Sequence, residues 1–341
     1  MSDVLIRLEG RAGRITLDRP KALNALSFAM VGTIDAALRA WENDSAVALV
    51  LIDGVGPRAF CAGGDIAETY HLARRGDFAG ARAFWGNEYR MDALIARYPK
   101  PYIALMHGYT MGGGVGVSGH GSHRIVGESA RVAMPECGIG LVPDIGGTQL
   151  LAAAPGRLGE YLGLTSDRMT PGDAIYAGFA DVLVPEAEWS GLVADLVATG
   201  DVGAIAPRVA PTPEPPLAAR QEAIDDAFSA TDLAALIARL EATDWGHGVL
   251  KVLATKSPLS MACTLELVRA ARREPGVEKA LRREHRFAWR SATNGDLLEG
   301  IRATVIDKDR RPIWRDSIDG VRPEQVAAML APLGDDDDLS F

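Results

Sequence analysis

Two glycine-dense loops give the chain its clearest capacity for chemistry. The first reads FCAGGD over residues 60–65, and the second reads MGGG over residues 111–114. Glycine lets a backbone approach a ligand closely and exposes its N–H groups, and two converging N–H groups form an oxyanion hole. Small residues in strand-to-helix turns also serve packing alone. The spacing of the glycines does not separate these two interpretations.

The second loop also contains the spacing of a dinucleotide-binding fingerprint, in Gly114, Gly116 and Gly119. This fingerprint requires a continuing helix inside a βαβ unit. Gly119, Gly121 and Gly127 leave little room for such a helix before the next strand. We therefore do not expect a dinucleotide site.

Two carboxylates follow prolines near the second loop. Glu136 comes after Pro135, and Asp144 comes after Pro143 in a glycine-rich turn. Two such groups can divide acid and base roles if their surroundings separate their pKa values. Helix capping or surface solvation is the alternative for an isolated Pro-Glu pair.

The histidines and Cys61 give little indication of a metal site or a nucleophilic thiol. The spacing of His107, His120 and His123 matches no metal site, and structural histidines explain them better. Cys61 lies in the first glycine loop, but no partner histidine can be identified for a nucleophilic thiol. We expect no metal ion.

Composition limits the class of protein. The 341 residues are 48% hydrophobic and 24% charged, which is typical of a globular protein, and the formal net charge of −9 argues against non-specific nucleic-acid binding. Three scattered cysteines favour a reducing compartment over a disulfide scaffold. Because neither a signal peptide nor a membrane-spanning run is apparent, we expect a cytoplasmic protein.

The elements that must position the loops alternate between strands and helices, which indicates an α/β fold. Strands are expected over residues 4–8, 14–17, 46–52 and 102–107, and a helix over 27–43 with Ser27 as its N-cap. We divide the chain into a core (1–200), a Pro-rich connector (201–220), a helical region (221–330) and an acidic tail (331–341). Ser257-Pro258 predicts a helix start, and the acidic run GDDDD at 334–338 is predicted to be disordered.

Taken together, these segments resemble the crotonase (enoyl-CoA hydratase/isomerase) superfamily. The matching residues are RPKALNAL at 19–26, AFCAGGD at 59–65, HGYTMGGG at 107–114, Pro135-Glu136 with Gly140, and Pro143 with GGT at 146–148. The closest similarity is to the 3-hydroxyisobutyryl-CoA hydrolase subgroup. It rests on TMGGGVG at 110–116, AMPE at 133–136, VPDIGG at 142–147, EGIRA at 299–303, IDKD at 306–309, and Pro312 with Trp314, and it spans nearly the whole chain.

The resemblance implies a core of stacked ββα turns, a helical C-terminal region and an acyl-CoA site. Catalytic roles would fall to Glu136, Asp144 and the backbone N–H groups of Gly64 and Gly113. The CoA moiety would lie along Lys21, Ala22, Leu23 and Ala62, with Lys21 and Arg58 near phosphate. Glu88 matches a substrate-contacting glutamate of the subgroup, although its context alone predicts a solvated helix face.

One departure narrows the implied reaction. Hydratases of this superfamily carry a glutamate at the position of Gly116, which has no side chain, and commonly a glycine at the position of Asp144. Hydration across a C=C bond requires both a placed proton and a held water, so loss of a carboxylate is costly. We therefore expect hydrolysis of 3-hydroxyisobutyryl-CoA, or a close β-hydroxyacyl-CoA, as in valine catabolism. Glu136 would act as general base or as nucleophile, and Asp144 would orient the 3-hydroxyl or the water.

Two alternatives stay open. The chain could be an enoyl-CoA hydratase or isomerase that uses Asp144 as a relocated acid, or a non-catalytic acyl-CoA-binding protein. The expected partner is the acyl-CoA substrate, without nucleic acid, membrane or separate cofactor, because coenzyme A is part of the substrate. Superfamily members often form trimers or hexamers, so a homo-oligomer is compatible with the resemblance.

Overall fold

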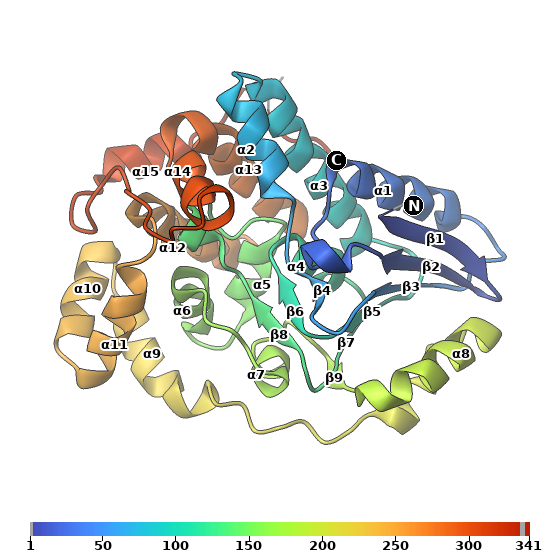
Figure 1. Cartoon of the computed structure of the whole chain (residues 1–341). Helices are drawn as coiled ribbons and strands as arrows, with labels where there is room; N and C mark the ends of the chain where they lie inside the picture. The colour runs from blue at the N-terminus through green and yellow to red at the C-terminus, as the bar shows by residue number, and fades with distance from the viewer. Residues whose placement is uncertain (1–2, 335–337) are drawn as a thin grey trace. The chain divides into compact units, whose positions relative to one another are not determined.

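The computed structural model describes residues 3–334 and 338–341 (Figure 1). Its chain divides into two compact units. The first unit comprises Met1–Asp65, Arg90–Ala133 and Arg168–Ala218. The second comprises Ile66–Tyr89, Met134–Asp167 and Ala219–Phe341. Each unit is therefore assembled from segments that are distant in sequence. The predicted division into core, connector, helical region and tail follows chain order, and it stays a prediction.

The first unit contains a six-stranded sheet and a three-stranded sheet. The larger sheet has the order β1 (Val4–Glu9), β2 (Ala12–Leu17), β3 (Leu49–Gly54), β5 (Tyr102–Met106), β7 (His123–Val126) and β9 (Val182–Leu183). The smaller sheet has the order β4 (Ala59–Cys61), β6 (Tyr109–Met111) and β8 (Arg131–Ala133). From β3 to β9, consecutive strands belong alternately to the larger and the smaller sheet. Within each sheet, these strands pair in parallel with their neighbours. This is the predicted α/β core of stacked turns, and only the N-terminal hairpin β1–β2 is antiparallel.

Helices complete the first unit. They are η1 (Pro20–Ala22), α1 (Phe28–Glu42), α4 (Gly113–Gly119), α7 (Pro171–Tyr176), η3 (Glu186–Glu188), α8 (Trp189–Thr199), η4 (Val202–Ala204) and η5 (Ala206–Arg208). The predicted cap of α1 is confirmed, because the Ser27 side chain accepts a hydrogen bond from the Met30 N–H. Leu192 and Leu196 of α8 are buried in the core with Leu49 and Leu51 of β3.

The second unit is helical. Its elements are α2 (Ile66–Arg74), η2 (Glu136–Ile139), α5 (Gly147–Ala153), α6 (Leu158–Thr165), η6 (Ala218–Arg220), α9 (Gln221–Phe228), α10 (Leu233–Glu241), α11 (Asp244–Leu253), α12 (Pro258–Arg273), α13 (Val277–Asn294), α14 (Leu297–Ile301), the π-helix η7 (Arg302–Ile306) and α15 (Pro323–Leu330). The long helix α3 (Phe78–Ala96) contributes residues to both units, and the first residue of η6, Ala218, belongs to the first unit. Ser257 caps α12 at the Ser260 N–H, as predicted. Helix α12 packs against α5, α6, α13 and α15.

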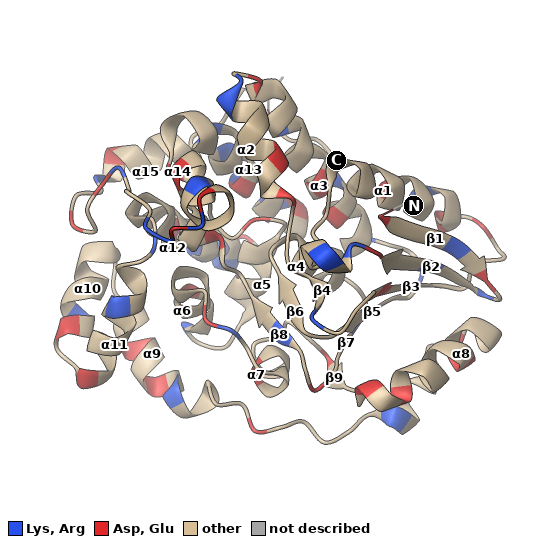
Figure 2. Ribbon diagram, in the orientation of Figure 1, with Lys and Arg blue, Asp and Glu red and all other residues tan. Residues whose placement is uncertain are grey.

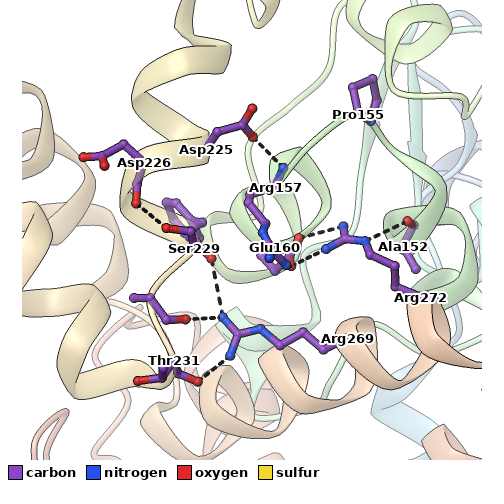
Figure 3. A network of polar contacts seen from close by, with 12 residues as sticks. Ala152, Pro155, Arg157, Glu160, Asp225, Asp226, Ser229, Thr231, Arg269 and Arg272 are labelled. Atoms are coloured by element: carbon purple, nitrogen blue, oxygen red, sulfur yellow. Dashed lines mark hydrogen bonds and ion pairs between the residues drawn. The ribbon is translucent and has the colours of Figure 1, made fainter.

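A buried carboxylate joins helices α6 and α12 of the second unit (Figure 3). Glu160 of α6 is fully buried and accepts hydrogen bonds from Arg157, at 3.0 Å, and from Arg272 of α12, at 2.7 and 3.0 Å. One turn earlier on α12, Arg269 donates to the carbonyls of Ala230 and Thr231. Away from this network, acidic and basic residues are interspersed along α9–α11 (Figure 2).

The end of the chain lies on α13. Arg286 pairs with Asp338 at 3.0 Å, Arg282 donates to the carbonyl of Leu339 at 3.1 Å, and the Leu339 side chain is buried. The predicted disorder is therefore wrong for Asp338, because its ion pair with Arg286 and the buried Leu339 beside it hold this part of the chain in place. Residues 335–337 lie outside the described residues. None of the described helices is long and apolar enough to cross a lipid bilayer.

Asn24 fixes the loop that follows η1 in the first unit. Its side chain is fully buried, and its Nδ2 donates to the carbonyls of Val55 and Ala59 at 3.0 and 2.9 Å. Its Oδ1 accepts from the Arg19 N–H at 2.9 Å. Its φ of 56° lies in the left-handed region, which asparagine tolerates better than most residues.

We expect Asn24→Ala to lower the free energy of unfolding by about 2–4 kcal/mol, because each stranded buried polar group costs about 1–3 kcal/mol. The measurement is urea unfolding. Asn43→Ala, at an exposed position, is the matched control and should change stability by less than about 0.5 kcal/mol. Equal effects of the two substitutions would contradict the assigned role of Asn24.

Candidate active site

The two glycine loops of the first unit lie against one another. Gly63, with a φ of +114°, follows β4, and a Cβ atom placed on it would lie 3.4 Å from the Met111 carbonyl and 3.9 Å from the Gly113 nitrogen. In the part of the chain that the structure describes, neither the Gly64 nor the Gly113 N–H donates a hydrogen bond to another residue. Two neighbouring loops thus each present an unused backbone donor.

Close packing sets the position of the second donor. A Cβ atom on Gly114 would lie 2.3 Å from the Cys61 carbonyl oxygen, so α4 begins directly against the backbone of β4. Glycine is required here because any side chain would collide with backbone atoms. The packing interpretation and the donor interpretation of these loops are therefore compatible.

The predicted CoA-binding residues form one group in the first unit. The Arg58 guanidinium donates to the Pro20 carbonyl at 3.2 Å, and the Ala62 N–H donates to the Leu23 carbonyl at 3.0 Å. Lys21 and Ala22 are exposed in η1. The structure thereby brings the two segments of this prediction together.

The predicted carboxylates lie in the second unit, where all three are buried. We define the acid cluster as Glu88, Tyr89, Glu136, Asp144 and Glu284. The Tyr89 hydroxyl donates to Asp144 Oδ2 at 2.7 Å. Glu88 Oε1 and Glu136 Oε2 accept no hydrogen bond from any residue in the described ranges. Because only 3% of Glu88 is exposed, the solvated face expected from its context is wrong.

Burial controls the protonation of the acid cluster. Desolvation, and then the charge of Asp144, raise the pKa values of Glu88 and Glu136 well above the usual range. Desolvation also raises the pKa of Asp144 to about 6 and that of Glu284 to about 8, against the lowering effect of their hydrogen bonds. Groups that exchange protons near neutral pH are suited to general acid–base chemistry.

Short segments hold the two central carboxylates. Glu136 begins η2, where the Cys137 carbonyl accepts from the Ser257 N–H at 2.9 Å. The Asp144 carbonyl accepts from the Gly147 N–H at 2.7 Å, which forms the turn into α5. Both turns are thus determined by backbone hydrogen bonds.

Three polar residues near these predicted positions were missed from the sequence. Tyr89 and Glu284 contact Asp144 or its loop, and Asp92 lies beside Gly116. Asp92 interrupts an otherwise apolar run from Met91 to Ile95 on α3, which was a usable signal for a buried carboxylate. Tyr89 and Glu284 carried no comparable local signal.

Position 116 lies directly beside the Asp92 carboxylate. A Cβ atom on Gly116 would lie 2.8 Å from Asp92 Oδ1 and 3.2 Å from its Cγ, and Asp92 is fully buried. A glutamate at position 116 would therefore require the Asp92 carboxylate to move.

The remaining reactive side chains have structural contacts. His107 Nε2 lies 2.6 Å from the Gly56 carbonyl, and His123 Nδ1 lies 2.9 Å from Ser122 Oγ. Cys61 is fully buried, with its Sγ 3.7 Å from the Gly63 carbonyl. Within residues 3–334 and 338–341, no group of three His, Cys, Asp or Glu residues is arranged to hold a metal ion.

The pKa of Asp144 predicts a pH dependence of stability. Since the folded state keeps a proton that the unfolded state releases, its stabilising contribution is complete below the ordinary value of 3.8 and is lost as pH rises through about 6. Asp144→Asn removes this titration but keeps an acceptor for Tyr89, so the decline in unfolding free energy across this window should become shallower. Urea unfolding at several pH values tests this, and identical slopes for the two proteins would contradict it.

Comparison with known proteins identifies the family. The sequence profile of the enoyl-CoA hydratase/isomerase family matches residues 12–330. A Gallus gallus protein named 3-hydroxyisobutyryl-CoA hydrolase, mitochondrial, is 35% identical over 350 residues that cover 98% of this chain and 90% of the relative. A solved structure named an enoyl-CoA hydratase from Rhodobacter sphaeroides is 55% identical, covers 100% of both chains and has a TM-score of 0.96. A Mycobacterium thermoresistibile structure named a carnitinyl-CoA dehydratase is 42% identical, with a TM-score of 0.95 and coverage of 100% and 99%. The chain therefore belongs to the enoyl-CoA hydratase/isomerase family.

Proposed function

We propose that the protein hydrolyses 3-hydroxyisobutyryl-CoA, or a close β-hydroxyacyl-CoA, to the free acid and coenzyme A. The observation that carries the proposal is Gly116, beside which the buried Asp92 carboxylate occupies the space that a side chain would need. The second glutamate of the family's hydratases is absent here. Glu136 alone can accept the proton of an attacking water, and this transfer suffices for hydrolysis. The name of the Gallus gallus relative supports the same reaction. A place in valine catabolism is part of the proposal.

The proposed mechanism begins with the thioester oxygen at the Gly64 and Gly113 amides. These donors would stabilise the oxyanion of a tetrahedral intermediate, and one such donor contributes about 2.7–4 kcal/mol in other enzymes. Glu136 accepts a proton from water while the water oxygen bonds to the thioester carbon. The C–S bond then breaks, and the CoA sulfur leaves and takes up a proton. In the alternative route, Glu136 attacks the carbon itself, and water then hydrolyses the mixed anhydride.

The other residues would bind and orient the substrate. Asp144, held by Tyr89, would orient the 3-hydroxyl or the water, and Glu88 would help define the acyl pocket. The cations Lys21 and Arg58 would lie near phosphate, with the backbone of Ala22, Leu23 and Ala62 along the adenine end. A cytoplasmic location is proposed from the sequence. The Gallus gallus relative, in contrast, is named as mitochondrial.

Hydration of an enoyl-CoA is the second candidate. It is favoured by the name of the Rhodobacter sphaeroides structure, which is 55% identical to this chain. In that reaction Asp144 would supply the acid that Gly116 lacks. The two reactions differ in whether a thiol is released.

Incubation with 3-hydroxyisobutyryl-CoA and, separately, with crotonyl-CoA separates the candidates. We expect free thiol from the first substrate and an unchanged enoyl absorbance with the second, because one general base can serve hydrolysis but not hydration. Loss of enoyl absorbance without thiol release would contradict the hydrolase proposal. A binding protein would change neither signal.

Glu136→Gln tests the general base. We expect kcat/KM for thiol release to fall about 10²–10⁴-fold, the usual contribution of general acid–base catalysis, with substrate binding largely kept. Glu160→Gln, at another buried glutamate of the second unit, is the matched control and should keep kcat/KM per folded molecule. An unchanged rate for Glu136→Gln would remove Glu136 from the mechanism.

A further inference from the structure

Helix α13 contributes a buried carboxylate to the loop that carries Asp144. Glu284 is fully buried, and its two oxygens accept hydrogen bonds from the Gly146 N–H at 2.8 Å and the Thr148 N–H at 3.0 Å. The Thr148 hydroxyl donates to the same carboxylate. These two N–H groups lie at the N-cap and second residue of α5, and the N-cap is a glycine without a capping side chain. Glu284 therefore supplies from another helix the cap that α5 lacks.

The next residue of α13 acts on the other side of Asp144. The ring of His285 meets the ring of Tyr89 edge to face, with centroids 6.0 Å apart and an interplanar angle of 88°. Tyr89 in turn donates its hydroxyl to Asp144 Oδ2 at 2.7 Å. Trp289, one turn further along α13, packs its ring edge to face against His285 at 5.6 Å and is covered by the Arg82 guanidinium.

Two consecutive residues thus constrain Asp144 through separate contacts. Glu284 holds the backbone of the turn in which Asp144 lies, and His285 packs against the tyrosine that binds its carboxylate. A carboxyl group suits the first task because its two oxygens can accept from the Gly146 N–H and the Thr148 N–H at the same time, one oxygen for each.

We propose that Glu284 and His285 are positioning residues that set the orientation of the Asp144 carboxylate toward the substrate. This inference rests on the proposed function, in which Asp144 orients the 3-hydroxyl or the attacking water. It makes the C-terminal helix α13 a part of the catalytic machinery, acting through Asp144 and without touching the reacting atoms.

A double-mutant cycle on thiol release from 3-hydroxyisobutyryl-CoA tests the proposal, using Glu284→Gln, Asp144→Asn and the double variant. We expect Glu284→Gln alone to lower kcat/KM by about 10²-fold, the effect of a displacement of about 1 Å at a catalytic group. In the Asp144→Asn background the same substitution should cost little, since the group it positions is already gone. If the two losses multiply in full, Glu284 acts independently of Asp144 and the proposal is overturned.

A matched control separates positioning from stability. Glu160→Gln removes a carboxylate that is equally buried but hydrogen-bonded to Arg157 and Arg272 (Figure 3). It should lower stability and yet keep kcat/KM per folded molecule. His285→Phe keeps an aromatic edge against Tyr89 and should retain most activity, whereas His285→Ala should lose activity as Glu284→Gln does. Equal activities of His285→Ala and the unmodified protein would remove His285 from the proposal.

Amide hydrogen exchange gives a readout that does not depend on the reaction. The Gly146 and Thr148 amides should exchange about tenfold faster or more in Glu284→Gln, and faster again in Glu284→Ala, because glutamine keeps one of the two acceptor oxygens and alanine keeps neither. Unchanged exchange would contradict the role of Glu284 in holding the turn, even if activity fell. If the unmodified protein released no thiol, the proposed function would fail, while the exchange result would still decide whether Glu284 holds the loop.

Discussion

Burial of carboxylates is the physical constraint on which the candidate site depends. Within the second unit, Glu88, Glu136, Asp144 and Glu284 are all buried, and desolvation is the main cause that raises each of their pKa values. The hydrogen bonds that reach Asp144 and Glu284 come from a tyrosine hydroxyl, a threonine hydroxyl and backbone amides. Such donors are neutral, so they orient the carboxyl groups without adding a positive charge that would keep them ionised. The result is a set of acids that hold protons closer to neutral pH than free carboxylic acids do.

Local patterns predicted the parts of this structure that local interactions determine. The hairpin, the capped helix α1 and the start of α12 each follow from residues within a few positions of one another. Glu136 and Asp144 were predicted as site residues because their motifs are local as well, and the structure shows both to be buried. Tyr89 and Glu284 were missed because their partners lie 55 and 138 residues away, where no spacing rule applies. The packed chain end was missed for the same reason, since its contacts are with α13.

Fold similarity alone does not select the reaction. The chain superimposes on a structure named as a hydratase with a TM-score of 0.96, and a relative named as a hydrolase is 35% identical. One fold can carry both reactions because chemistry depends on a few side chains placed on it. At Gly116 the difference is physical: a buried Asp92 carboxylate lies where a larger residue would have to begin. The unused amides of Gly64 and Gly113 would serve either reaction, since both pass through a negatively charged carbonyl oxygen.

The long separation between Glu284 and the turn it caps has a consequence for biosynthesis. The two are 138 residues apart, and at a translation rate of about 5–20 residues per second the helix that supplies the cap is made roughly 7–28 s after the turn. During that interval a nascent chain holds its glycine-rich turn without the acceptor that orders it. Assembly of the acid cluster is therefore a late step, reached only when most of the polypeptide has been synthesised.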